Sequence, residues 1–311
     1  MLLKQILELF DMLDAPNANG YDLKELLLAR GADEVTVETV TGDKGSTDCI
    51  KVLINGRNGK SAGGTAPTLG IIGRLGGLGA RPEVIGFVSD GDGALAAMAA
   101  ALKLAEMHAR GDVLNGDVII TTHICPDSPT QDHFPVPFMD SPIDMQLCNR
   151  MDVDDRMDAI LSIDTTKGNR VINLNGIAIS NTIKEGYILE VSNDIMDVMT
   201  RVTGQLPAIF PCSQQDITPY GNDLHHLNSI LQPAVASNAP VVGVAITTTQ
   251  PVAGCATGAS HAMDVEAAAR FAVEVAKDYG DGKIAFYNEK EFAHLIELYG
   301  TMNQFQTFGK A

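Results

Sequence analysis

Four side chains suited to binding a divalent metal follow apolar, β-rich runs of the sequence. They are Asp90, Asp127, Asp164 and His261. The runs before them are Val84–Val88, Asp117–Thr122, Ala159–Ile163 and Pro240–Thr247. Carboxylate oxygens and imidazole nitrogens are common ligands of zinc and related ions. Because α/β sheets present ligand-binding residues where their parallel strands end, these residues predict a site for one ion, zinc or another divalent metal.

A glycine-rich turn beside the first aspartate gives a rival signal. Gly91–Ala96 matches the G-x-G-x-x-A pattern that binds dinucleotides between a strand and a helix. However, Asp90 and Asp92 would stand where the pyrophosphate should bind, and their charges oppose the anion-attracting field of a helix N-terminus. The sequence therefore favours a simple tight turn over a nucleotide site.

Each member of the metal set also has an ordinary structural interpretation. Asp90 is placed to cap the helix that begins near Ala94, and Asp164 to cap a turn. His261 could be a hydrogen-bonded polar residue with no ligand. A metal-free binding module is thus the alternative to a metal site.

The charge of the chain limits its partners. Of the 311 residues, 45% are hydrophobic and 20% are charged, and the formal net charge is -17. Nucleic acid and anionic membranes would be repelled by such a chain. We therefore expect a small-molecule or peptide ligand, with cationic ligands or metals favoured, and neither nucleic acid nor membrane as a partner.

The cysteines and the N-terminus predict a cytoplasmic protein. Five cysteines form no C-x-x-C pair, and one is left over in any disulfide scheme. The first residues have the pattern of an amphipathic helix and not that of a signal peptide. No apolar run is long enough to span a membrane.

The first third of the chain predicts helices around an antiparallel pair of strands. The expected elements are helices over Leu2–Leu13 and from Asp22 to Gly31, strands over Val35–Thr41 and Cys49–Ile54, and a helix over Ala94–Arg110. Between residues 59 and 93 there are eleven glycines, so bent or closely approached backbone is expected there.

The remainder alternates strands with helices. After a strand from residue 117 comes a loop at about 124–145, whose length suggests a functional role. The later expected elements are strands near Val171, Ala178 and Ile188, a strand over Val241–Thr247, and helices over Ser192–Thr203, Asp223–Ser237 and Asp264–Tyr279. This order predicts a single α/β domain over residues 1–311, a three-layer α/β/α sandwich around a mostly parallel mixed sheet.

The order of these features resembles a known class of enzymes. The segments Leu2–Leu7, Ala15–Pro16 and Gly20–Leu27 resemble the opening of co-catalytic zinc aminopeptidases of the glutamyl and leucyl kind. The chain is also similar to a bacterial family of unknown function with about 300 residues. Members of that family carry the loop His-Ile-Cys-Pro-Asp, here His123–Asp127, and the segment Pro-Val-Pro-Phe-Met, here Pro135–Met139.

The resemblance implies a zinc-peptidase-like (phosphorylase/hydrolase-like) fold and a role for each metal candidate. Asp90 would take the place of the aspartate that bridges two zinc ions, and Asp164 that of the aspartate on the first zinc. His261 would take the place of the last ligand of the second zinc. Asp127 would take the place of a ligating glutamate.

Two departures from the family pattern limit this reading. Pro126 falls where the peptidases carry their general base, and it has no group that can accept a proton. Arg74 and Gly76 fall where the first histidine ligand and its companion aspartate belong. Standard two-zinc aminopeptidase activity is therefore not expected. We expect instead a degenerate site that binds one ion.

Other residues would then have to act as the base and bind the substrate. His123 and Asp92 are the catalytic candidates, His123 as a substitute base, and Asp132 or His133 from the long loop are further possibilities. Arg74, which could pair a substrate carboxylate, is a candidate for substrate binding. Asp223 and His225 are two more, although His225 and His226 are adjacent on the expected helix and only one could face a site.

Three hypotheses follow. The first is a hydrolase-like enzyme that uses a metal to cleave an amide in a peptide-like or amino-acid-derived substrate. The second is a catalytically inactive, peptidase-like protein that binds a small anionic or peptide ligand. The third is a nucleotide-dependent enzyme. The resemblance also implies that a homo-oligomer is compatible with this chain.

Overall fold

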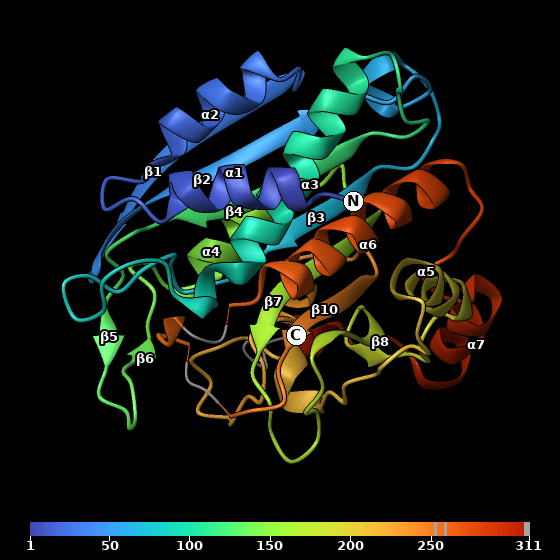
Figure 1. Ribbon diagram of the computed structural model, residues 1–311. Coiled ribbons are helices and arrows are strands. Elements are labelled where there is room, and N and C mark those ends of the chain that lie inside the picture. The colour runs from blue at the N-terminus through green and yellow to red at the C-terminus, as the bar shows by residue number, and fades with distance from the viewer. Residues whose placement is uncertain (252–253, 258–259, 308–311) are drawn as a thin grey trace.

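An eight-stranded mixed sheet forms the centre of the protein (Figure 1). This computed structural model describes residues 1–251, 254–257 and 260–307. The strands, in spatial order, are β1 (Glu34–Gly42), β2 (Gly45–Ile54), β4 (Val118–Ile124), β3 (Leu69–Gly73), β7 (Ala159–Thr166), β10 (Val241–Thr247), β8 (Gly176–Lys184) and β9 (Tyr187–Ile188). The four central strands are parallel, and the outer pairs run antiparallel to their neighbours.

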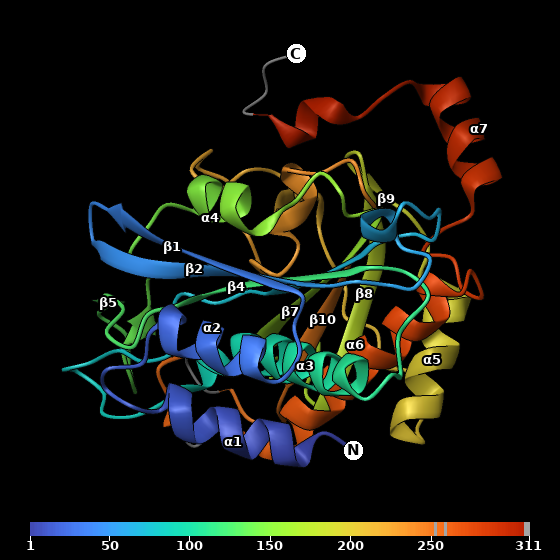
Figure 2. The same ribbon diagram turned by 90° about the horizontal axis from the view of Figure 1, so that it is seen from above.

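Helices cover both faces of the sheet. Figure 2 shows α1 (Leu3–Leu13), α2 (Gly20–Ala29), α3 (Asp92–Ala109) and α6 (Ala262–Gly280) on one side. The opposite side carries α4 (Met145–Asp152) and the short 3-10 helix η4 (Gln232–Val235). Helix α5 (Asn193–Thr203) packs beside α6, and α7 (Glu289–Tyr299) leads into a C-terminal arm that ends in η6 (Asn303–Gln306). The predicted three-layer α/β/α class is confirmed.

Helix α3 lies deep in the molecule because its side chains are small. It packs against β3, β4 and β7 on one side and against α1 and α6 on the other. All alanines from Ala94 to Ala101 are fully buried. Small side chains let a helix approach its neighbours closely on every side, so α3 is fixed in place by packing.

Two glycines set the position at which α3 begins. A Cβ atom on Gly73, at the end of β3, would lie 2.7 Å from the carbonyl oxygen of Gly93. A Cβ atom on Gly93 would lie 2.6 Å from the carbonyl oxygens of Arg74 and Ile163. Only glycine permits this approach, which holds the start of α3 against the carboxyl ends of β3 and β7.

Most of the predicted elements are confirmed, with several differences. The run Val84–Val88 forms no strand: Gly86 has φ +95°, and only an isolated bridge joins Val84 to Ala80. The region near Val171 is also not a strand. Residues 223–237 form turns and η4 where an α-helix was expected. The glycine-rich segment, by contrast, contains the central strand β3.

The carboxylate of Asp216 explains the absence of a helix after Asp223. This fully buried side chain accepts hydrogen bonds from the backbone of Leu227 (2.6 Å) and Asn228 (3.0 Å). These amides are thereby held in a loop, and Pro233 cannot donate a helical hydrogen bond.

Among the described residues, no helix is long and apolar enough to cross a membrane.

Candidate functional site

A pocket of about 660 Å³ opens where β3 and β7 end. Its floor contains Arg74, Asp90, Asp164, Tyr220 and Ser229. The long loop after β4, which carries the small hairpin β5 (Thr130–Gln131) and β6 (Phe138–Met139), supplies one wall together with the turn between β1 and β2. The loop that the sequence marked for its length therefore borders this pocket.

Asp90 and Asp164 form a coupled pair of carboxylates. Asp164 accepts hydrogen bonds from the Ser229 hydroxyl (2.8 Å) and the Thr165 amide (2.7 Å), and Asp90 accepts one from the Gly76 amide (2.9 Å). Burial raises the pKa of Asp164 to about 7, and the nearby charge of Asp90 adds to this rise. Burial also raises the pKa of Asp90. Like charges this close favour the protonated form of one partner.

The ammonium group of Lys167 interacts electrostatically with these acids. Its Nζ lies 3.7 Å from Asp92 Oδ2, and its side chain is only 10% exposed. Burial lowers the pKa of Lys167, while Asp92, Asp90 and Asp164 oppose this shift. Asp90, Asp92 and Asp164 thus all act on one ammonium group, and two of these acids, Asp90 and Asp164, line the pocket.

Arg74 is already neutralised by the protein. Its guanidinium donates to Asp152 at 2.6 Å, both side chains being 4% exposed, and it also contacts the sulfur of Met145. Burial raises the pKa of Asp152, an effect that the charge of Arg74 opposes. Nε of Arg74 has no hydrogen-bond partner among the described residues. Pairing with a substrate carboxylate, as predicted, would have to compete with Asp152.

Of the four predicted metal ligands, the structure brings only Asp90 and Asp164 together in the pocket. Asp127 is absent from the pocket lining and lies near the Cys125 thiol (3.5 Å). His261 stands at the start of α6, about half exposed, 3.1 Å from Asp264. Within the described residues, no three His, Cys, Asp or Glu side chains are placed to hold a metal. Metal binding by these four residues stays a prediction.

His123 lies in the core and not in the pocket. It is buried in β4, where Nε2 is 2.9 Å from the Leu75 carbonyl and Nδ1 is 2.8 Å from the Thr47 hydroxyl. Since a carbonyl only accepts, Nε2 must carry the proton. Burial also lowers the pKa of His123. With both nitrogens bonded internally, this geometry does not support the predicted role as a base.

The remaining candidates lie outside the pocket lining. Asp92 is the first residue of α3 and is fully buried, with Oδ1 accepting from Ser260 at 2.6 Å. Asp223, at φ +61°, and His225 are exposed on the loop before η4. The helix that the sequence predicts there does not form, and neither residue lines the pocket, so their roles in substrate binding stay a prediction.

Comparison with known proteins places the chain in a family. Residues 38–309 match the family described as Protein of unknown function (DUF1177). The chain belongs to this family. No curated protein matches its sequence.

Solved structures show that this family member shares a known fold. Acidobacteriales bacterium glutaminyl cyclase aligns with a TM-score of 0.50 and 12% identity, over 90% of this chain and 94% of that chain. Legionella pneumophila LapA aminopeptidase aligns with a TM-score of 0.49 and 10% identity, over 92% of this chain and 71% of that chain. At such identities the likeness to the cyclase establishes the fold alone.

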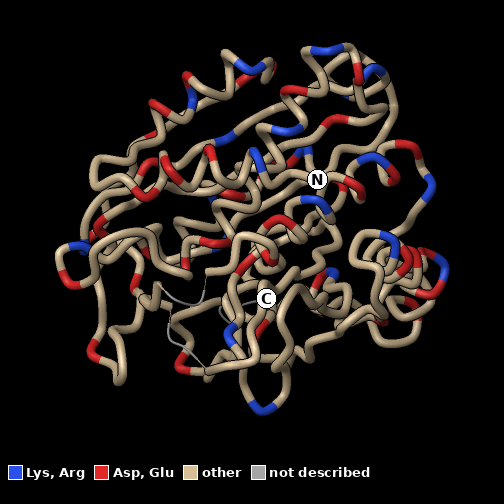
Figure 3. Tube along the Cα trace, in the orientation of Figure 1, with Lys and Arg blue, Asp and Glu red and all other residues tan. Residues whose placement is uncertain are grey.

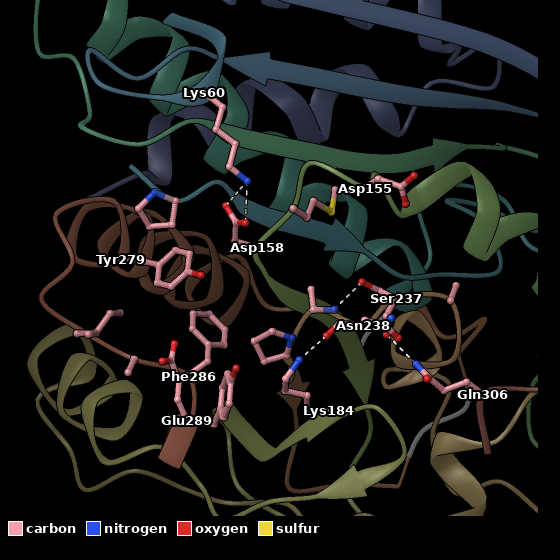
Figure 4. A pocket seen from close by; sticks show the side chains of 18 of the residues that line it. Lys60, Asp155, Asp158, Lys184, Ser237, Asn238, Tyr279, Phe286, Glu289 and Gln306 are labelled. Carbon is pink, nitrogen blue, oxygen red and sulfur yellow. Dashed lines mark hydrogen bonds and ion pairs between the residues drawn. The ribbon is translucent and has the colours of Figure 1, made fainter. Parts of the chain in front are cut away.

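A larger cavity of about 1010 Å³ lies at the opposite edge of the sheet (Figure 4). Its lining includes Asp158 and Pro240, which directly precede β7 and β10. The charged groups drawn there are largely paired internally, since Lys60 contacts Asp158 at 2.7 Å and Lys184 donates to the Asn238 carbonyl at 2.7 Å. The pocket where β3 and β7 end, called the acidic pocket below, has a larger excess of acidic over basic side chains than this cavity.

Sequence reasoning missed several residues that shape the acidic pocket. Tyr220 stacks on His226, with ring centroids 4.2 Å apart, so His226 and not His225 supports the pocket. Lys167 follows the strand-end Asp164 by three residues, a spacing that could have suggested its role. Nothing in the local sequence marks Ser229 or Asp152, because each contacts a partner that is far away in the sequence.

Proposed function

We propose that the acidic pocket binds a small peptide-like or amino-acid-derived amide through a free amine, and that the protein acts on this ligand as a hydrolase. The observation that carries the proposal is the excess of acidic over basic side chains in the pocket lining. Ammonium groups bind well where carboxylates are held together and partly removed from water.

The charges of the lining support a cationic ligand over an anionic one. Lys44 and Arg74 are its basic residues, and each has an acidic partner: Asp140 at 2.5 Å for Lys44, and Asp152 at 2.6 Å for Arg74. The lining acids without a basic partner of this kind are Asp43, Asp90, Asp144 and Asp164. An anionic ligand bound by Arg74, the alternative drawn from the sequence, would meet this excess of carboxylates.

The proposed reaction assigns different tasks to the two floor carboxylates. Asp90 holds the ammonium group of the ligand. Asp164 exchanges a proton with water or with the leaving amine, a task for which a pKa of about 7 is well suited. The neighbouring hydroxyl of Ser229 orients the Asp164 carboxylate by its 2.8 Å hydrogen bond.

The single ion predicted from the sequence is not part of this proposal. Catalytic zinc commonly has three protein ligands, and the pocket supplies two of the four predicted ones. Elemental analysis of protein purified without chelator should give less than about a tenth of an equivalent of zinc, manganese or cobalt. A full equivalent, lost on Asp164→Ala, would restore the metal-assisted mechanism.

Hydrolysis can be followed by mass spectrometry with a panel of amino-acid amides. We expect at least one amide to be cleaved and Asp164→Asn to lower its rate by about a hundredfold or more, because general acid–base catalysis contributes factors of that size. Asp112→Asn is a matched control on the surface beyond α3 and should leave the rate unchanged. Equal rates for Asp164→Asn and the wild type would refute the assigned role.

A further inference from the structure

A second pocket lies on the helical face of the protein. Its volume is about 570 Å³, and it is bordered by α1, residues 85–87, the start of α3 and the start of α6. Figure 1 shows α1 passing across α3 close to α6. It shares no lining residue with the acidic pocket. The proposed function therefore does not account for it.

The walls of this second pocket are mainly apolar. The apolar lining residues are Ile6, Leu7, Phe10, Ile85, Phe87, Leu95, Ala262 and Val265. Leu7 is 51% exposed and Ile85 is 86% exposed, so apolar side chains continue from the pocket to the surface. The rings of Phe10 and Phe87 meet with centroids 5.2 Å apart. Such walls favour a ligand with an apolar body.

The charged side chains in the lining are both acidic. They are Asp14 and Asp92, and no basic side chain accompanies them in the lining. Asp92 is fully buried, and its Oδ1 accepts a hydrogen bond from the Ser260 hydroxyl at 2.6 Å. Its Oδ2 has no hydrogen-bond partner among the described residues, although Lys167 Nζ lies 3.7 Å away from it.

We propose that this pocket binds a small hydrophobic amine. Its apolar body packs against Phe10 and Phe87, and its ammonium group points toward Asp92. Asp92 Oδ2 accepts no hydrogen bond among the described residues and has the Lys167 ammonium 3.7 Å away, so a donor from a ligand completes its contacts. A carboxylate or phosphate ligand would instead be repelled by both aspartates.

The proposal is tested with 4-phenylbutylamine as the probe and calorimetry as the readout. Wild-type protein should bind this amine saturably. Its affinity for the neutral 4-phenylbutan-1-ol should be lower by about tenfold or more, since a charged hydrogen bond contributes that much. Leu7→Lys places a cation at the rim of the pocket, and Ala262→Phe obstructs its mouth. Each should weaken binding of the amine about tenfold or more.

Further variants locate the probe. Asp92→Asn keeps the shape of the side chain and should also weaken binding about tenfold. Asp112→Asn and Asp164→Asn should retain it, and retention in Asp164→Asn separates this pocket from the acidic one. Because Leu7 and Ala262 are surface positions, their variants keep the test valid if Asp92→Asn fails to fold. Absence of saturable binding, or unchanged affinity in both Leu7→Lys and Ala262→Phe, would overturn the proposal.

Discussion

Asp152→Ala should lower the free energy of unfolding by about 3–5 kcal/mol, because it leaves a buried guanidinium without its partner. Arg74 and Asp152 contact each other at 2.6 Å with only 4% of each side chain exposed. Both side chains are almost completely removed from water, so a charge left there without its partner is costly. Urea unfolding followed by circular dichroism measures the change.

Two comparisons make this first result specific. Asp278→Ala removes the partner of Arg201, whose side chain is 55% exposed, and should cost less than about 1 kcal/mol. The double change Arg74→Met with Asp152→Leu removes both charges, and it should be less destabilising than Asp152→Ala alone. A loss of stability in Asp152→Ala no larger than that in Asp278→Ala would show that the buried pair is not important for stability.

Asp164→Asn should stabilise the protein at pH 8 by about 2–3 kcal/mol more than it does at pH 5. Burial raises the pKa of Asp164 to about 7 from an ordinary value of 3.8. Between these values the unfolded chain releases its proton while the folded protein retains it, so wild-type stability falls as pH rises from about 4 to about 7. Asparagine, which resembles the protonated acid, removes this contribution.

Thermal or urea unfolding from pH 4 to pH 9 tests this second result. A shallower loss of stability is expected in the variant, with the remaining slope due in part to Asp92, whose pKa burial also raises to about 7. Asp112→Asn should reproduce the wild-type profile. Parallel profiles for Asp164→Asn and the wild type would contradict the assignment.

The sequence predicted elements well where local pattern and packing agree. The apolar spacing of α1 and the alanine run of α3 both favour a helix, and a helix forms in each case. Strand β3 was hidden because Gly70 and Gly73 look like loop residues, whereas Gly73 is required for the close approach of α3. The run Val84–Val88 looks like a strand but forms a loop, from which Phe87 and Val88 are buried while Ile85 is exposed.

Two of the predicted site residues are brought together by the order of the strands and by the start of α3. Asp164 lies on a central parallel strand, and Asp90 stands beside its carboxyl end because Gly93 holds the start of α3 there. The pairing of Arg74 with Asp152 joins residues 78 positions apart and could not be read from local pattern. This distant acid already pairs with Arg74, so a ligand carboxylate would have to compete with it.

Calorimetric titration of leucinamide and N-acetylleucinamide tests the central claim most directly. The two molecules share an amide and a side chain but differ in the free amine that Asp90 is proposed to bind. We predict saturable binding of leucinamide, at least about tenfold weaker binding in Asp90→Asn, and no measurable binding of N-acetylleucinamide. Equal binding of both compounds, or binding of neither, would contradict an amine-binding acidic pocket.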